Sequence, residues 1–434
     1  MKTRLQRAIV VAAALVSLSA LVAPGPGSAH STDGEREKCP CCMPPKQLAK
    51  KVRRLPKKRA QREKLRIAEL GHVSMVGYTA DVWAHNGFAY VGSSSQGVAI
   101  VDIRNPSRAK TIGRVARIPG TSAEDLEVRR IETPYFTGDL LVVGIQCPYG
   151  TAGERGMEIW DVTDPFQPRH LAFWRSDVRR SDQARGVHEL YLFSQGDRAF
   201  VGAMTPESEE AGSYGDFRIV EVTNPREPVQ IADWGAFKDG KFKDSSRHFP
   251  WGHSATVNEA GNTAVISFWD AGTVFLDLTD PARPRMKHHI LRPSGPEGNT
   301  HSTNLSPDDS LMLVTDENLS PLKGKFPWGF LRVWDISDVD NPRKLSEYAT
   351  KNSRNKRGPG LYSIHNTVLK DNLVYMSWFS DGIRVLDLAD REHPRALAAF
   401  KPKNALFWGV FVTEDGLILG SDINRGLYIL RLDP

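Results

Sequence analysis

Histidine is the residue type whose spacing in this sequence points most directly to chemistry. The chain has 434 residues and only 12 histidines, and four of these open successive strand-like segments: His188, His253, His301 and His365. Imidazole nitrogens are suitable ligands for Zn, Cu, Fe and Ni. Four imidazoles at one repeated position therefore predict a site for a divalent transition metal.

Acidic residues accompany these histidines in two groups. When the strand-like segments are aligned on the turns that follow them, Asp81 and Asp125 fall at the histidine position, and Trp408 completes the set. The second group lies in the turns that pair with three of the histidine segments: Asp270, Asp316 and Asp381. A carboxylate that accepts a hydrogen bond from a metal-binding histidine fixes its tautomer and raises its basicity. We expect that role for the second group.

Three interpretations of the histidine position are open. The imidazoles bind a metal, or they are structural and hydrogen-bond an aspartate of their own repeat, or they contact a ligand without a metal. A bound metal would not by itself mean catalysis, since a catalytic site keeps an open coordination position. An enzyme would use Asp81, Asp125 or Glu317 as proton acceptor. Catalytic residues are not assigned, and the cofactor expected is a divalent transition metal or none.

A strand-turn sequence recurs seven times and predicts the scaffold that positions these residues. The copies read AIVDIRNP, EIWDVTDP, RIVEVTNP, VFLDLTDP, RVWDISDVDNP, RVLDLADREHP and YILRLDP, and successive final prolines lie 59, 60, 56, 61, 52 and 40 residues apart. Alternating apolar residues with Asn, Asp, Gly and Pro between them are typical of strands and tight turns. Units of this length favour four strands each, stacked radially in a propeller.

The two ends of the repeat region predict how the ring closes. The last copy stops after its third strand at Pro434, whereas Leu65–Met75 resembles the fourth-strand sequence RKLSEYAT of another copy. We therefore expect an all-β fold, a seven-bladed β-propeller over residues 65–434 whose last blade is completed by the N-terminal strand. A helix continuing the basic leader is the alternative for this segment.

The motifs YVGSSSQGVAIVDIRNP, WDVTDP and IRVLDLAD resemble the LVIVD-repeat family of exported bacterial β-propellers. The resemblance covers roughly residues 67–434. It implies the propeller fold and export, and it does not imply a chemistry, because propellers include enzymes, binding proteins and scaffolds.

The first 29 residues have the composition of a signal peptide. Lys2, Arg4 and Arg7 precede an apolar segment, and small residues at positions 27–29 predict cleavage before His30. An uncleaved anchor helix is the alternative. Residues 30–64 read as a poorly ordered, basic linker. Residues 31–70 carry a net charge of +8, whereas residues 71–434 carry −5.

The linker also holds three of the four cysteines, Cys39, Cys41 and Cys42, and the fourth is Cys147. Disulfides are the default in an oxidising compartment, so Cys147 has three potential partners. The cluster CPCCM also suits a soft metal such as Cu(I). The sequence does not choose between these roles.

These observations favour a secreted or extracellular monomer. Its basic segment is either a solvated linker or an arm that binds anionic wall polymer or lipid head groups, and the second role would associate the protein with the cell wall. We expect a binding or scaffold module that uses the loop-rich face, where long insertions gather, with a metal at the channel mouth. Its ligand is unknown, and the possibilities are a cell-wall polymer, a glycan or a protein. No nucleic acid partner and no transmembrane span are expected. The alternative function is a metal-dependent oxidoreductase or hydrolase centred on the four histidines.

Overall fold

The computed structural model describes residues 65–147, 153–176, 186–205, 215–240, 252–291, 299–318, 327–355 and 359–433. The predicted signal peptide (1–29) and the whole of the basic linker (30–64), including its three cysteines, lie outside these residues. Strands dominate the described chain. Its helices are the short η2 (Pro106–Arg108) and α3 (Lys351–Asn355).

Every strand group is an antiparallel meander of four strands. The first two groups are β2 (Thr79–His85), β3 (Phe88–Ser93), β4 (Val98–Asp102) and β5 (Lys110–Val115), then β6 (Ser122–Glu132), β7 (Thr137–Gln146), β8 (Gly156–Asp161) and β9 (Arg169–Arg175). A single residue pair, Ser93 with Ala123, joins these two groups into one eight-stranded sheet.

The remaining groups are separate four-stranded sheets. Their strands are β10 (Glu189–Gln195), β11 (Arg198–Met204), β12 (Phe217–Glu221) and β13 (Val229–Trp234); β14 (Gly252–Val257), β15 (Thr263–Phe268), β16 (Gly272–Asp277) and β17 (Arg285–Leu291); β18 (Asn299–Leu305), β19 (Leu311–Glu317), β20 (Leu331–Asp335) and β21 (Arg343–Tyr348); β22 (Thr367–Lys370), β23 (Leu373–Trp378), β24 (Gly382–Asp387) and β25 (Arg395–Phe400). The last sheet combines β26 (Phe407–Val412), β27 (Leu417–Asp422) and β28 (Gly426–Asp433) with β1 (Arg66–Val73).

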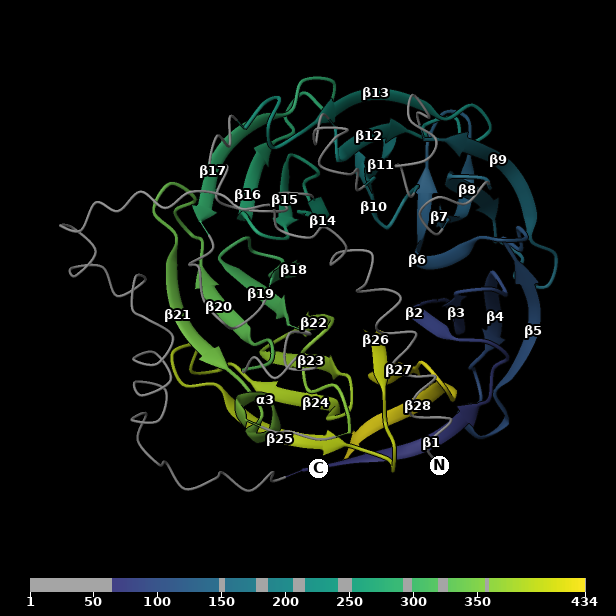
Figure 1. Cartoon of the computed structure of the whole chain (residues 1–434). Helices are drawn as coiled ribbons and strands as arrows, with labels where there is room; N and C mark the ends of the chain where they lie inside the picture. The colour runs from purple at the N-terminus through teal and green to yellow at the C-terminus, as the bar shows by residue number, and fades with distance from the viewer. Residues whose placement is uncertain are drawn as a thin grey trace, which may run out of the picture.

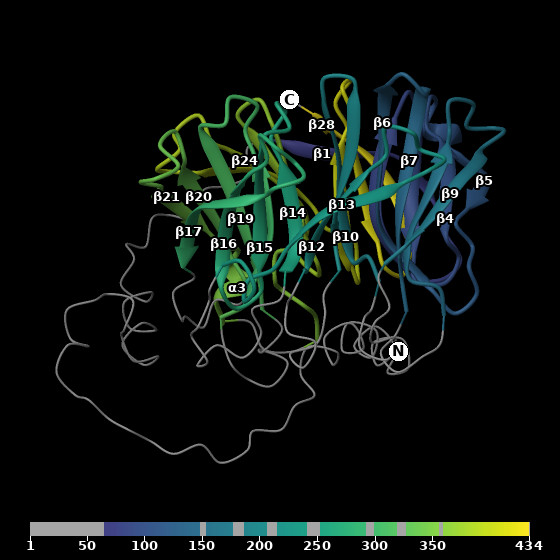
Figure 2. The ribbon, with the colours of Figure 1, turned by 90° about the horizontal axis from the view of Figure 1, so that it is seen from above.

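The groups are arranged as blades around a central axis. Figure 1 shows the first strand of each group, β2, β6, β10, β14, β18, β22 and β26, closest to the centre of the ring, with the fourth strands at its rim. Turned by 90°, the strands run across the thickness of the ring from one face to the other (Figure 2). Residues at the same place on the first strands therefore meet around one channel.

The repeated aspartate of the sequence motif has a local structural role. At the end of the third strand, the side chain of Asp161 accepts a hydrogen bond from the backbone N–H of Thr163 at 3.0 Å, and Asp277 does the same for Thr279 at 2.9 Å. Such Asx turns satisfy backbone donors where the chain leaves a sheet. The motif therefore specifies the turn into the outer strand, which explains why it identifies the fold and not the activity.

The N-terminal strand closes the ring as the sequence predicts. β1 pairs antiparallel with β28 from Arg66 opposite Asp433 to Val73 opposite Leu427. Ile67 is only 4% exposed and packs in the apolar cluster between the last two blades. The two ends of the described chain thus share one sheet, seen at the bottom of Figure 1.

Apolar side chains between neighbouring blades form the core. One cluster joins Val142 and Ile159 of one blade to Leu192 and Val201 of the next, and all four are fully buried. Sheet faces are buried against each other in this way around the ring, so the blades hold the first strands in fixed positions. None of the helices in the described segments has the length and apolar character needed to cross a membrane.

Candidate metal centre at the channel mouth

A β-bulge near the start of the first strand positions the candidate site residues. Register shifts occur between Gly252 and Ser254 in β14 and between Thr300 and Ser302 in β18, and in each case the extra residue is the histidine. A bulge bends the strand locally and re-aims a side chain. Because the same bulge occurs in several blades, it directs the side chains at this position towards the centre of the ring.

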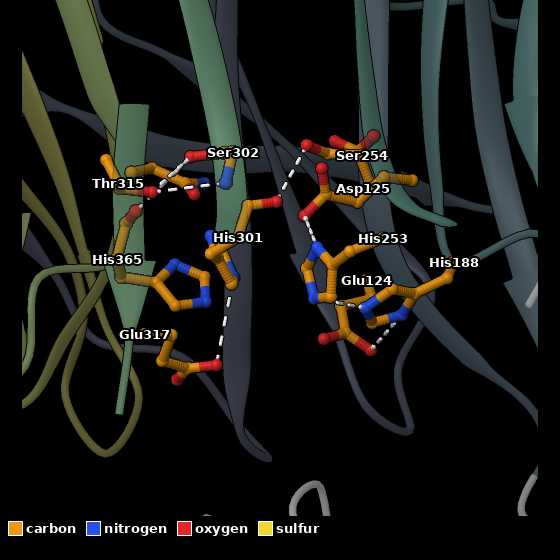
Figure 3. Close-up of polar contacts among 12 residues, drawn as sticks. Glu124, Asp125, His188, His253, Ser254, His301, Ser302, Thr315, Glu317 and His365 are labelled. Atoms are coloured by element: carbon orange, nitrogen blue, oxygen red, sulfur yellow. Dashed lines mark hydrogen bonds and ion pairs between the residues drawn. The ribbon is translucent and has the colours of Figure 1, made fainter. Parts of the chain in front are cut away.

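The four histidines stand in a continuous row. The ring centroids of His188 and His253 are 4.6 Å apart, those of His253 and His301 are 4.2 Å apart, and those of His301 and His365 are 4.2 Å apart. Trp408 continues the row, with its ring 4.2 Å from that of His365. Figure 3 shows these imidazoles side by side between the strands. All four are buried.

Two of the histidines and one glutamate form the group best suited to a metal. Nε2 of His188 lies 3.0 Å from Nε2 of His253, and the two imidazoles share a hydrogen bond whose donor depends on the tautomer. Two imidazole nitrogens that each lie about 2.0–2.1 Å from one ion are separated by roughly 3 Å, so this spacing fits a shared metal. Within the described residues, the single group of three potential ligands with all donor atoms within 4.8 Å of one another is His188, Glu189 and His253.

Carboxylates face the other nitrogen of both histidines. Nδ1 of His188 lies 3.3 Å from the Gln146 side-chain oxygen and 3.7 Å from a Glu124 carboxylate oxygen. Nδ1 of His253 lies 3.5 Å from a Glu189 carboxylate oxygen. A carboxylate at Nδ1 keeps the Nε2 lone pair available for a metal. Glu189 is therefore either a direct ligand or the hydrogen-bond acceptor behind His253.

His365 and His301 are held neutral. Burial lowers the pKa of His365 to about 3, and burial together with the neighbouring His253 and His365 lowers the pKa of His301 well below its usual range. Nδ1 of His365 donates to the backbone oxygen of Trp408 at 3.0 Å. In a neutral imidazole the other nitrogen then carries the lone pair. Both residues extend the row of potential ligands beyond the three-residue group.

Buried carboxyl groups nearby have raised pKa values. Burial, with a smaller contribution from Glu124, raises the pKa of Glu317 to about 8. Its carboxylate lies 3.9 Å from Nε2 of His301. Burial also raises the pKa of Asp81 to about 7, partly opposed by a hydrogen bond from the Val82 N–H. Both groups can exchange protons near neutral pH, which is the property of a general acid or base.

The structure places Asp81 and Asp125 one residue beyond the position of the histidines. The bulge in β2 falls between Thr79 and Val82, and the bulge in β6 falls between Ala123 and Leu126. The residues in the histidine position are therefore Ala80 and Glu124. A bulge inserts one residue, so an alignment based on turns slips by one.

The two aspartates form hydrogen bonds between blades instead. Asp125 accepts a hydrogen bond from the backbone N–H of Leu190 in the next blade at 2.7 Å. Asp81 accepts one from the side-chain amide of Asn366 at 2.8 Å, across the blade that contains Gly409. Ser254 donates to the backbone oxygen of His301 at 2.8 Å. The residue that follows the histidine position thus forms a hydrogen bond with another blade.

The three aspartates of the paired turns have polar partners other than the imidazoles. Asp316 pairs with Arg332 on β20, Asp270 accepts a hydrogen bond from Asn299, and Asp381 accepts one from Lys401 at 2.6 Å. Their predicted role as acceptors for the histidines remains a prediction. The carboxylates that the structure places beside the imidazoles are glutamates: Glu124, Glu189 and Glu317.

Glu124 and Glu189 were missed by the sequence reasoning. Glu189 directly follows His188, and its significance depends on the contact with His253 of the next blade. Glu124 would have been found by allowing one inserted residue in the alignment of the first strands. The described cysteine, Cys147, is a buried free thiol that contacts the backbone oxygen of Glu154 at 3.2 Å. The predictions for Cys39, Cys41 and Cys42 lie outside the described residues.

Comparison with known proteins agrees with this architecture. Residues 76–116, which include β2 to β5, match the family model of the LVIVD repeat. Among solved structures, the chain is similar to the β-propeller domain of Myceliophteria thermophila Cps50 (Swd1), with 11% identity, a TM-score of 0.55, and coverage of 85% of this chain and 99% of that one. Among curated proteins, none matches this sequence. The protein is a β-propeller that carries an LVIVD repeat.

Proposed function

We propose that the protein is an exported binding module whose channel mouth holds a divalent transition metal. His188 and His253 supply Nε2 ligands, and Glu189 supplies a carboxylate or orients His253. The observation that carries the proposal is the 3.0 Å separation of the two Nε2 atoms, with carboxylates facing the Nδ1 atoms. Imidazole and carboxylate donors suit Zn, Cu, Fe or Ni.

The energetics of burial support a metal at this place. Imidazoles taken out of water lose hydration that packing alone does not replace, and an unsatisfied buried polar atom costs about 1–3 kcal/mol. Nδ1 of His301 is buried without a hydrogen-bond partner among the described residues. A cation that attracts the imidazole lone pairs and the nearby carboxylates would offset this cost. Export is supported by the signal-like composition of residues 1–29.

A metal-dependent enzyme is the second candidate, and a specific observation favours it. Three protein ligands leave coordination positions open for water or a substrate, which is typical of catalytic sites. Glu317, with its pKa raised to about 8, is placed to exchange a proton beside His301. Such an enzyme would activate water or an oxidant at the metal.

Elemental analysis of purified full-length protein tests the metal proposal. We expect one metal ion per chain, lost in His253→Ala. His393→Ala is the matched control, because His393 is exposed and pairs with Asp390 far from the channel. A variant with Cys39, Cys41 and Cys42 replaced by serine should keep the metal. Metal retained in His253→Ala, or lost in the serine variant, would contradict the proposal.

The same variants separate the two functions. If the protein is a binding module, metal-loaded protein retains its affinity for a wall polymer or glycan when Glu317→Gln is introduced. If it is an enzyme, Glu317→Gln keeps the metal and loses turnover, because the proton carrier is gone while the ligands remain.

A further inference from the structure

One of the seven positions that correspond to the histidines around the channel carries almost no side chain. The residues in the histidine position around the channel are Ala80, Glu124, His188, His253, His301, His365 and Trp408. Ala80 offers only a methyl group between the large side chains of its two neighbours in the ring, Glu124 and Trp408. A gap is therefore expected between the indole and the carboxylate.

A pocket occupies this gap. It is partly enclosed and has a free volume of about 20 Å³, with lining residues Tyr78, Thr79, Ala80, Ser94, Ser122, Glu124, Trp408 and Ile423. A volume of this size accommodates a group of one or two non-hydrogen atoms. The pocket therefore fits the end of a chain-like ligand that enters from the channel mouth.

The walls of the pocket differ in chemistry. Trp408 and Ile423 are apolar and buried, so they suit a methylene group, and an indole also attracts a cation. Glu124, Ser94 and Ser122 provide oxygen atoms that accept hydrogen bonds, and one Glu124 carboxylate oxygen already accepts one from the side-chain amide of Gln146. The combination matches a group that is both an alkyl chain end and a hydrogen-bond donor.

The electrostatic surroundings favour a positive group. Besides Glu124, the inner strands carry Asp81, Asp125 and Glu189 close together. Of these carboxylates Glu124 lines the pocket itself, and Coulomb attraction at this short range favours an ammonium ion over a neutral or anionic group.

We infer that the pocket between Trp408 and Glu124 binds the primary ammonium end of an alkyl chain. The methylene carbon next to nitrogen packs on Trp408 and Ile423, and the ammonium group donates to Glu124 and the serine hydroxyls. The inference places a ligand end beside the proposed metal, since Glu124 also lies 3.7 Å from His188 (Figure 3). It rests on the pocket and its charge, and it does not require the metal.

Calorimetric titration of the full-length protein in a chelating buffer tests this site. The probes have the same chain length: 1,4-diaminobutane, butane-1,4-diol and succinate. We expect the diamine to bind at least tenfold more tightly than the diol, and succinate not to bind. Equal affinity for diamine and diol, or binding of succinate, would overturn the inference.

Two variants assign the binding to the pocket. Ala80→Val fills the gap with two methyl groups and should weaken diamine binding at least tenfold, whereas Ala399→Val on the outer strand β25 should not. Glu124→Gln keeps the shape of the wall and should remove the preference for diamine over diol. Thermal denaturation checks that each variant is folded. Wild-type affinity in Ala80→Val would refute the site.

His253→Ala keeps this test separate from the proposed function. That variant should lose the metal and still bind the diamine, because neither the indole nor Glu124 is altered. If diamine binding persists in protein that never binds metal, the metal proposal fails alone. If metal binding is confirmed and the diamine does not bind, the present inference fails alone.

Discussion

Burial determines the protonation states of the residues at the channel mouth. Taking a titratable group out of water disfavours its charged form, so histidines become weaker bases and carboxylic acids become weaker acids. His365 and Glu317 show the two directions, with pKa values of about 3 and about 8. At neutral pH the site therefore offers neutral imidazoles with lone pairs and a protonated acid that can release its proton when a cation arrives.

Glu317 gives a prediction for the pH dependence of stability. Its pKa in the folded protein is about 8, compared with the usual 4.5, so the folded state holds a proton that the unfolded state has released. Its contribution to the free energy of unfolding is fully present below pH 4.5 and is lost as pH rises towards 8. Glu317→Gln mimics the protonated acid and should be more stable than wild type at pH 8.5.

Comparison of wild type with Glu317→Gln between pH 6.5 and pH 8.5 isolates this group. Other groups that titrate in this window, such as Asp81 and the histidines of the unfolded chain, are common to wild type and Glu317→Gln, so the difference between the two proteins reports Glu317 and amounts to about 2 kcal/mol at about 1.4 kcal/mol per pH unit. Denaturant unfolding of metal-free protein at both pH values measures it. The exposed Glu414→Gln should show no such change. A Glu317→Gln variant that follows the wild-type pH profile would rule out this explanation.

At the level of single residues, the sequence could identify the histidines but not their carboxylate partners. His188, His253, His301 and His365 repeat at corresponding places, so the pattern is visible in the chain. The contacts of Glu124 with His188 and of Glu189 with His253 cross from one blade to the next. Such contacts depend on the bulge and on the packing of blades, and neither has a sequence signal of fixed spacing.

At the level of elements, the first strand of each blade determines where the residues of the candidate site lie. Its bulge separates two consecutive residues, one facing the channel mouth and one bonding the neighbouring blade. In β26 these residues are Trp408 and Gly409, because the register shift lies between Phe407 and Val410. The glycine is required by space: a Cβ at Gly409 would lie 2.1 Å from Asp81 Oδ1 and 2.8 Å from Ser421 Oγ.

Gly409→Ala should therefore destabilise the protein. The added methyl group displaces Asp81 and weakens its hydrogen bond from Asn366, so we expect a loss of about 1–3 kcal/mol in the free energy of unfolding. Gly113→Ala is the control, since a Cβ there meets nothing within 4 Å. Chemical denaturation compares the two. Equal stability of both variants would show that the bulge accommodates a methyl group without displacing Asp81 or Ser421.

Strand positions and turns were the most predictable elements. Apolar alternation and the Asp at the end of each third strand encode them locally, as the Asx turns of Asp161 and Asp277 illustrate. The one-residue insertions were not predictable, because the chain on either side of a bulge still alternates. This explains why the fold was predicted more completely than the site.

At the level of the whole molecule, closure of the ring depends on a strand from the opposite end of the sequence. β1 supplies the outer strand to the blade formed by β26, β27 and β28. Ile67 on β1 packs in the cluster that also contains Leu397 of the preceding blade. The ring is therefore held closed by backbone pairing and by apolar contact between the last two blades.

Ile67→Ala tests this closure. Removing a buried side chain of this size costs about 2–5 kcal/mol, and the loss should appear as a lower midpoint of denaturant unfolding. Glu69→Ala on the same strand is the control, because Glu69 is exposed and should change stability by no more than about 0.5 kcal/mol. If Ile67→Ala unfolds at the wild-type denaturant concentration, β1 does not contribute to the closure.

We propose a metal ion at the channel mouth of this ring of blades. Anomalous diffraction from crystals of the metal-loaded full-length protein, recorded at the absorption edge of the bound metal, locates it directly. We predict one strong peak at the channel mouth within bonding distance of Nε2 of His188 and of His253, next to Glu189. A peak elsewhere in the chain, or no peak at these histidines, would contradict it.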